Sequence, residues 1–357
     1  MTGHKDAQAQ SGGEGPPARA RRTRVVRAVG LGLAGVLVLG AAAAGWAYRH
    51  LDGNIRSVDV DSALGDNRPA RAMTTPTPSG TASEVPVATG ALNILVLGSD
   101  SRDGANRALG GGDSGGARSD TAMVVHLDAG RTRATVVSIP RDTLVDRPSC
   151  PRESGGSTGP AYGVMFNTAY AVGGPVCAVK TVESITDIRM DHFVEVDFSG
   201  FARLVDALGG VTVTTTEDIH DEDSHLDLAA GTHHLDGTDA LALARTRHGI
   251  GDGSDLGRIG LQQDLVKALL DQIAANGLLT SPTRLYRVAD AATRSLTTDT
   301  GLDSLSELTG LARSLSGLSS ANVTTVMLPV VPAPSDPNRV VADEPEATEL
   351  WRSLERA

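Results

Sequence analysis

The sequence predicts an α/β domain whose helices cover both faces of a central sheet, behind one apolar helix near the amino terminus. From about residue 91, short β-branched runs alternate with stretches of helical periodicity. Hydrophobic residues make up 40% of the 357-residue chain, although aromatic residues account for only 3%. That composition is enough for a real core, packed mainly from aliphatic side chains. We therefore expect one large domain with accessory segments.

The amino-terminal region predicts a membrane anchor. Residues 1–27 are polar and rich in Gly, Pro and Arg, which is typical of a disordered tail. Residues 28–48 carry no charge and, at ~1.5 Å per residue, would span roughly 30 Å of hydrocarbon. The run is preceded by Arg19, Arg21, Arg22, Arg24 and Arg27 and ends with Trp46 and Tyr48. We expect a single-pass helix in the plasma membrane, with a cytoplasmic amino terminus and the rest extracellular. A cleaved signal peptide is the alternative.

Two polar segments are expected to flank the folded domain. Residues 49–90 include TTPTPSGTASEVP, a composition typical of a flexible linker. Residues 332–357 are rich in Pro, Asp and Glu and predict a loose acidic tail. The extracellular domain is therefore expected over 91–331.

Within that domain the elements follow from the hydrophobic pattern. Three β-branched runs at 92–100, 121–129 and 133–144 predict neighbouring core strands. Further strands are expected at 191–199, 211–215 and 323–331, and helices at 164–174, 176–188, 200–210, 238–244, 258–276, 281–296 and 302–316. In the helix at 258–276, Leu265, Val266, Leu269, Leu270 and Ile273 recur at helical spacing, so one face should pack on the sheet.

The chain has two cysteines, Cys150 and Cys177. Neither belongs to a CxxC or histidine pattern typical of zinc. Outside the membrane we expect them to form a disulfide. Two unconnected buried thiols are the alternative.

Acidic and basic residues come together at predicted strand ends. Asp100 ends the first core strand and Asp120 opens the second, and open α/β sheets usually bind ligands at such ends. Two carboxylates held this way suit Mg²⁺ on a phosphate, with Mn²⁺ as the alternative ion. Arg118 lies two residues before Asp120, and Arg141 follows the end of the third predicted strand, in each case an acid beside a base. Taken alone, such a pair is more often a pair of solvated loop charges or a structural salt bridge than a ligand site.

A second group of basic residues raises the case for a ligand site. Arg245 and Arg247 have the i, i+2 spacing that sends two side chains of an extended segment the same way. Arg258 and Gln262 are four apart at the start of a helix, so they share a face where an anion is favoured. Planar guanidinium donors together with a metal are what a diphosphate requires.

Six motifs follow one another over about residues 91–275, namely LNILVLGSDSR, GARSDTAMVVHLD, VVSIPRDTLV, FVEVDFSGFARLVDALGGV, LDGTDALALARTRH and GSDLGRIGLQQ. Taken together and in this order, they resemble the LytR-CpsA-Psr family. The resemblance implies a three-layer α/β/α domain with a central mixed sheet and an apolar tunnel for a prenyl chain. It also implies a membrane-anchored phosphotransferase that moves a glycopolymer from a polyprenyl diphosphate carrier onto peptidoglycan, with a pyrophosphatase side activity.

Carried over by position, the resemblance assigns roles to nine residues. Asp100 and Asp120 correspond to metal-binding aspartates. The residues around the diphosphate correspond to Arg118, Arg141, Arg245, Arg247, Arg258 and Gln262, with Asp255 in the same motif. Where the family often has RQQ, this chain has Leu261, Gln262 and Gln263.

Two other readings of the charged residues are less favoured. The stretch 214–236 holds His220, His225, His233 and His234 among acids, but it lacks an HExxH or similar pattern, so a charged surface loop is expected rather than a metal site. Beyond residue 27, 26 Lys and Arg stand against 41 Asp and Glu, a net charge of −15 that would repel a nucleic acid.

The expected function is therefore a glycopolymer–peptidoglycan transferase with Mg²⁺. Asp120 and Asp142 are candidates for taking the acceptor's proton. A polyprenyl diphosphate hydrolase would use the same site with water instead of an acceptor. A non-catalytic anchor that binds wall polymer or lipid carrier would keep the arginines but would not need two metal-binding carboxylates.

Overall fold

The structure is a computed structural model that describes residues 18–71, 90–99, 119–152, 155–246, 255–275, 277 and 281–356, without the side chains of 18–34 and 255–256. Two compact units can be distinguished, residues 1–50 and residues 51–357.

The first unit contains nearly all of the helix α1 (Ala18–Asp52), which includes the apolar run 28–48. Val36, Leu37, Val38 and Leu39 are between 67% and 73% exposed, and the Trp46 ring stacks on His50 with centroids 5.2 Å apart. Among the described residues, we find no helix with the length and apolar character needed to cross a membrane. The transmembrane segment therefore stays a prediction.

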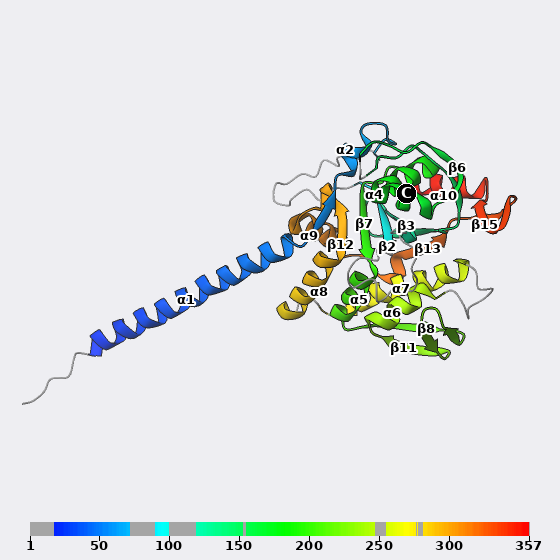
Figure 1. The fold of residues 1–357 in the computed structure, drawn as a ribbon. Helices are drawn as coiled ribbons and strands as arrows, with labels where there is room; N and C mark the ends of the chain where they lie inside the picture. The colour runs from blue at the N-terminus through cyan, green and yellow to red at the C-terminus, as the bar shows by residue number, and fades with distance from the viewer. Residues whose placement is uncertain are drawn as a thin grey trace, which may run out of the picture. The chain divides into compact units, whose positions relative to one another are not determined.

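In the second unit, the described residues form a seven-stranded sheet (Figure 1). Its strands in spatial order are β1 (Arg56–Val58), β12 (Leu296–Asp299), β7 (His192–Asp197), β2 (Leu92–Ser99), β3 (Ser119–Leu127), β4 (Ala134–Ile139) and β13 (Val323–Met327). The pairs β1–β12, β2–β7 and β4–β13 are parallel, and the remaining neighbours are antiparallel. The predicted mixed sheet is confirmed.

Helices cover both faces of this sheet, because alternate side chains of the strands are apolar on both sides. Leu95 and Leu97 belong to the core cluster that α2 (Val60–Leu64), α4 (Asn167–Thr186) and α10 (Glu346–Glu355) close. On the opposite face, Ile94 and Val96 pack with α7 (Asp255–Ala275) and α9 (Leu305–Ser314). The three-layer α/β/α arrangement is therefore confirmed.

A second core lies beside the sheet. It is built by α5 (Phe198–Leu208), α6 (Gly237–Arg245), α7 and two small hairpins, which pair β8 (Val211–Thr215) with β11 (Gly231–Leu235) and β9 (Ile219–Asp221) with β10 (Leu226–Leu228). Val205, Leu235, Leu243 and Leu265 are buried at its centre. The helix α8 (Pro282–Ser295) packs on α5 (Figure 1). The stretch 214–236, expected to be a charged loop, is thus mostly hairpin, because its alternating apolar residues face this core.

The carboxyl-terminal segment corrects the predicted tail. Residues 332–357 were expected to be loose, but β14 (Val330–Ala333), β15 (Asp336–Ala342) and α10 are ordered elements. Ala347, Trp351 and Leu354 recur at helical spacing and are at most 5% exposed, packed into the main core. Burial of this apolar face holds the segment in place despite its acidic composition. Short 3₁₀ turns, η2 (Thr300–Leu302) and η3 (Ser320–Asn322), precede α9 and β13.

The predicted linker 49–90 is also partly folded. Residues 56–64 form β1 and α2, while 72–89 lie outside the described residues. The Arg68 guanidinium donates to both carboxylate oxygens of Glu183 on α4 and to the carbonyl of Met190. Its pKa is raised: burial alone would lower it, but the hydrogen bonds and charges of Glu183 and Asp61 outweigh burial. A buried ion pair therefore ties this segment to the core.

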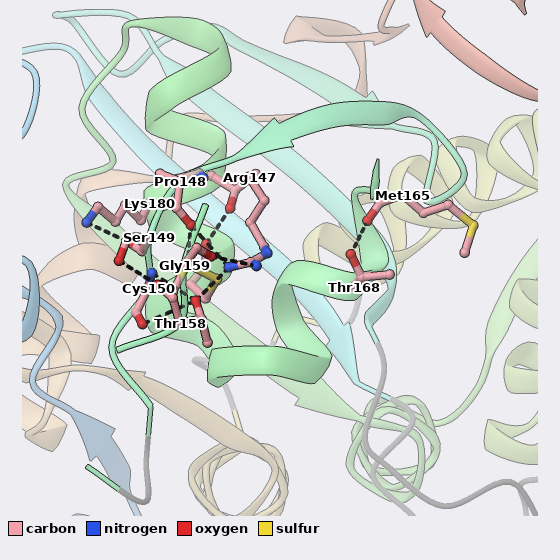
Figure 2. Close-up of a disulfide and its surroundings, with 11 residues drawn as sticks. Arg147, Pro148, Ser149, Cys150, Thr158, Gly159, Met165, Thr168 and Lys180 are labelled. Carbon is pink, nitrogen blue, oxygen red and sulfur yellow. Dashed lines mark hydrogen bonds between the residues drawn. A yellow bond between two sulfur atoms is a disulfide. The ribbon is translucent and has the colours of Figure 1, made fainter. Parts of the chain in front are cut away.

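Cys150 and Cys177 form the predicted disulfide (Figure 2). It joins α4 to the loop of a hairpin made by β5 (Leu144–Arg147) and β6 (Ala161–Met165). Figure 2 shows Arg147 donating to the Thr158 hydroxyl and the Gly159 carbonyl at 2.7 and 3.0 Å. At Gly173, beside the disulfide, a Cβ would lie 2.7 Å from a carbonyl oxygen, so the close approach requires glycine. The disulfide is thus surrounded by hydrogen bonds and close packing that hold the hairpin loop against α4.

Candidate functional site

Four strands bring their ends to one edge of the sheet. Ser99 at the end of β2 pairs with Ser119 at the start of β3 and with Asp197 at the end of β7. Ile139 at the end of β4 pairs with Ala122 near the start of β3. Residues that follow β2, β4 and β7 or begin β3 therefore meet at this edge, as the sequence predicted for Asp120 and Arg141.

A cavity of about 620 Å³ opens at this edge. Its polar lining consists of Asp120, Thr121, Arg141, Arg245, Arg258, Gln262, Asp197, Asp221, Asp223 and Ser224. Its apolar lining includes Val96, Met123, Val196, Phe198, Phe201, Leu265, Val266 and Leu269, supplied by the sheet, α5 and α7. The cavity therefore combines cationic, acidic and aliphatic surfaces.

Asp120 and Arg141 form an ion pair in the cavity wall. Arg141 Nη1 donates to Asp120 Oδ1 at 2.7 Å, and both side chains are partly buried. A short charge-assisted bond of this kind fixes both groups. The two residues form a salt bridge and also line the cavity. Their interpretation as a structural salt bridge is therefore compatible with their interpretation as part of a ligand site.

Asp142, the neighbouring carboxylate, has other partners. Its Oδ1 lies 3.1 Å from Nη1 of Arg339 on β15, and its Oδ2 lies 3.7 Å from Nε of Arg141. Asp142 does not line the cavity, whereas Asp120 does. Of the two candidates for accepting the acceptor's proton, Asp120 is the better placed.

The start of α7 contributes two buried groups. Arg258 is 3% exposed, and its Nη2 donates to the Asp120 carbonyl oxygen at 3.1 Å. Gln262 lies one turn later and donates from Nε2 to the Ala244 carbonyl oxygen at 2.8 Å. Both line the cavity, which confirms that the i, i+4 pair shares one face. Each also fastens α7 to a neighbouring element of the site.

Arg245 ends α6 and reaches the cavity from the side opposite the sheet. Its Cζ lies 5.0 Å from the ring centre of Phe198, at the start of α5. A guanidinium stacked on an aromatic ring is held in a defined plane while its charge remains. The residue after it, Thr246, is fully buried.

The predicted site residues divide into two groups. The described side chains of Asp120, Arg141, Arg245, Arg258 and Gln262 all line one cavity. Asp100, Arg118 and Arg247 lie outside the described residues, and Asp255 is described only as the first backbone position of α7. The roles of this second group stay predictions.

The structure adds cavity residues that the sequence motifs did not indicate. Asp221, Asp223 and Ser224 come from the turn between β9 and β10, and Phe201 comes from α5. Asp221 Oδ1 accepts from the backbone N–H groups of Asp223 and Ser224 at 2.9 and 3.3 Å. The sequence DEDS at 221–224 is typical of such an Asx turn. We nevertheless expected a solvated loop there, because the stretch is acidic.

The comparison with known families decides the family of this chain. The LytR_cpsA_psr family model matches residues 48–356, well over half of the sequence. The chain belongs to the LytR-CpsA-Psr family. Its match extends through α10, beyond the motifs at 91–275 that carried the resemblance.

This LytR-CpsA-Psr chain is similar to relatives whose names refer to cell-wall synthesis. It is 35% identical to the probable cell wall biosynthesis protein LcpB of Corynebacterium glutamicum, over 74% of this chain and 61% of the relative. It is 31% identical to the polyisoprenyl-teichoic acid–peptidoglycan teichoic acid transferase TagV of Bacillus subtilis, over 65% and 57%. The aligned chain thus spans about three-fifths of these relatives' length.

A solved structure shares the fold. The structure of TagT bound to LI-WTA superimposes with a TM-score of 0.56 at 26% identity, covering 77% of this chain and 94% of TagT. The agreement supports the LytR-CpsA-Psr fold over most of the second unit.

The cavity lining contains oxygen groups of the kind that bind magnesium. They include the carboxylates of Asp120, Asp221 and Asp223, and hard oxygen ligands are those that Mg²⁺ prefers. In the part of the chain that the structure describes, no group of three or more His, Cys, Asp or Glu forms a complete metal site. Asp100, the second predicted ligand, lies outside that part. Magnesium binding therefore stays a proposal.

Three of the four histidines of 214–236 make local contacts. His234 Nδ1 lies 3.1 Å from the Thr212 hydroxyl, and His233 Nε2 lies 2.7 Å from the Ala229 carbonyl. His220 pairs loosely with Asp227 at 3.7 Å. They lie on the β8–β11 and β9–β10 hairpins and are not part of the cavity lining.

Proposed function

We propose that the chain is a membrane-anchored phosphotransferase that moves a glycopolymer from a polyprenyl diphosphate carrier onto peptidoglycan. The observation that carries this proposal is that three guanidinium groups and a set of aliphatic side chains line the same cavity. A polyprenyl diphosphate combines the same two chemistries, since its diphosphate is anionic and its chain is hydrocarbon. The relatives named as teichoic acid transferases favour the same substrate class.

The anionic end of the donor would meet three described guanidinium groups. Arg141, Arg245 and Arg258 approach the cavity from β4, α6 and α7 respectively. Each is fixed by a further contact. Arg141 donates to the Asp120 carboxylate, Arg245 stacks on the Phe198 ring, and Arg258 donates to the Asp120 backbone carbonyl. Preorganised cations of this kind stabilise charge that develops in the transition state without reorganising.

The aliphatic lining would hold the first part of the prenyl chain. Val96 and Met123 from the sheet and Leu265, Val266 and Leu269 from α7 all line the cavity. Burial of apolar surface contributes about 25 cal/mol per Å². This affinity is independent of the sugar, so one lining can serve different glycopolymers.

In the proposed step, an acceptor hydroxyl oxygen of peptidoglycan attacks the sugar-side phosphorus. A new P–O bond forms to the acceptor, the bridging P–O bond breaks, and prenyl phosphate leaves with both bonding electrons. The acceptor's proton passes to a carboxylate, for which Asp142 and Asp120 are the candidates, Asp120 only in a step in which it does not bind the metal. Most of the rate would come from positioning and charge stabilisation.

Two further features belong to the proposal. Asp100 and Asp120 would hold Mg²⁺, which when bound neutralises diphosphate charge and polarises the reacting phosphorus. The apolar run 28–48 behind five arginines would anchor the chain in the plasma membrane with residues 51–357 outside.

The test uses the purified full chain in detergent with Mg²⁺, a glycosyl polyprenyl diphosphate and peptidoglycan fragments. We expect prenyl phosphate together with a covalent glycan–peptidoglycan product, both dependent on the acceptor. Prenyl phosphate released equally without acceptor would instead identify a hydrolase. Binding of the donor with neither product would identify a non-catalytic anchor.

A further inference from the structure

The position of Arg245 depends on the chain segment at the end of α6. The helix ends at Arg245, and Thr246 turns into extended backbone with φ −56° and ψ 131°. Thr246 is fully buried, although its side chain carries a hydroxyl group. A buried hydroxyl has to find hydrogen-bond partners, so its contacts show what fixes this turn.

The Thr246 hydroxyl is bonded on two sides. Its Oγ1 donates to the Ala242 carbonyl at 2.9 Å and lies 2.9 Å from Ser224 Oγ. A hydroxyl has one proton, and the carbonyl can only accept. The Ser224 hydroxyl must therefore donate to Thr246, which fixes the direction of both bonds.

Ser224 is itself held by a buried turn. Asp221, 2% exposed, accepts from the backbone N–H groups of Asp223 and Ser224. The turn between β9 and β10 is thus a firm support for the Ser224 hydroxyl. From the other side, Gln262 on α7 donates to the Ala244 carbonyl at 2.8 Å. Hydrogen bonds from two separate elements bracket Arg245.

We propose that the Ser224–Thr246 hydroxyl pair positions the Arg245 guanidinium in the cavity, which makes Ser224 and Thr246 positioning residues for the transfer. The pair lies 22 residues apart in the chain and joins the β9–β10 turn to the end of α6. Packing alone could be supplied by apolar side chains, whereas a fully satisfied polar pair selects one geometry. This inference rests on the function proposed above.

The experiment compares Thr246→Val, which keeps the shape but removes the hydroxyl, with Thr246→Ser, which keeps the hydroxyl. Thr181→Val is the matched control, because Thr181 on α4 is also fully buried and donates to a carbonyl four residues earlier, Cys177, at 2.7 Å. For the full chain in detergent with Mg²⁺, we would measure kcat and KM of transfer, affinity for geranylgeranyl diphosphate by calorimetry, and melting temperature.

We expect Thr246→Val to lower kcat by roughly tenfold to a hundredfold, as small misplacements of a catalytic group do. Thr246→Ser should act close to wild type, and Thr181→Val should melt lower while keeping kcat. In an Arg245→Ala background, Thr246→Val should lower neither kcat nor probe affinity further, although it still lowers the melting temperature. A merely structural hydroxyl pair would not show this dependence on Arg245.

Losses from Thr246→Val and Arg245→Ala that multiply in the double variant would overturn the proposal, as would a Thr246→Ser variant as poor as Thr246→Val. If the wild-type chain binds geranylgeranyl diphosphate but transfers no glycan, the transferase function fails. The hydroxyl pair is then judged by the same double-variant comparison of probe affinity. A wild-type chain that binds no probe would overturn both proposals.

Discussion

Arg258 and Arg245 line the same cavity, but they should differ sharply in what they contribute to stability. Arg258 is buried and donates to the Asp120 carbonyl oxygen. In Arg258→Ala, that carbonyl loses its donor, at a cost of about 1–3 kcal/mol, and the stem leaves a void worth about 1–2 kcal/mol more. The void and the lost bond overlap, so we expect a loss of about 2–4 kcal/mol. For a domain of this size, melting should fall by roughly 4–8 °C.

Arg245→Ala should be much milder for the fold. Arg245 is only partly buried, and its guanidinium stacks on the Phe198 ring. Loss of that contact should cost about 0.5–1 kcal/mol and lower melting by roughly 1–2 °C. Both variants should transfer glycan about a hundredfold or more slowly than wild type, because each removes a positive charge from the diphosphate end.

The assay pairs calorimetric melting with the rate of prenyl phosphate release in acceptor-dependent transfer. His233→Ala is the control, since His233 is half-buried, makes only a local contact with Ala229 and lies outside the cavity. It should change neither quantity. An Arg258→Ala variant that melts with wild type would refute the buried hydrogen bond. Arginine variants with wild-type transfer rates would refute the diphosphate site itself.

Three further predictions concern the fold. No free thiol should be alkylated without reductant, and removing the Cys150–Cys177 bond should cost about 3–4 kcal/mol in a denaturant titration, given its 27-residue separation; two alkylated thiols would contradict it. Burial lowers the pKa of His126, so stability should fall as the pH drops below about 6.5, and this fall should be shallower in His126→Gln; an identical slope would count against it. Trp351→Ala should cost about 3–5 kcal/mol by chemical denaturation, whereas a loose tail would lose nothing.

The sequence predicted the sheet and its helices well where patterns were long and uniform. The β-branched runs at 92–100 and 121–129 became β2 and β3, and the period of apolar residues at 258–276 became α7. The assignment of Arg141 and Asp120 to one site was also confirmed, because antiparallel pairing of β3 and β4 brings both to the same end of the sheet; their ion pair was not predicted.

The missed elements had competing signals. Pro332, Pro334 and Pro345 suggested a loop, yet Trp351 and its helical neighbours bury enough surface to fold the segment. The four-residue β12 is too short to show a period, and its place in the sheet depends on pairing with β1 and β7. Such tertiary pairings are not encoded in local patterns.

In the site, side chains with a motif were found and those without one were missed. Arg245 and Gln262 belong to recognisable spacings, whereas Asp221 and Ser224 enter through a turn that only the packing of two hairpins places beside α6. The double hydrogen bond of Thr246 could not be inferred from spacing, because its partners come from different elements.

The most direct test of the central claim follows the phosphorus atom. A donor labelled with ³²P on the sugar-side phosphorus is incubated with the full chain, Mg²⁺ and peptidoglycan fragments, and the products are separated. If the acceptor hydroxyl attacks that phosphorus at the arginine-lined cavity, the label should appear in a phosphodiester linkage to peptidoglycan, with unlabelled prenyl phosphate as the other product. Label retained with the prenyl product, or glycan joined to peptidoglycan without label, would contradict the account.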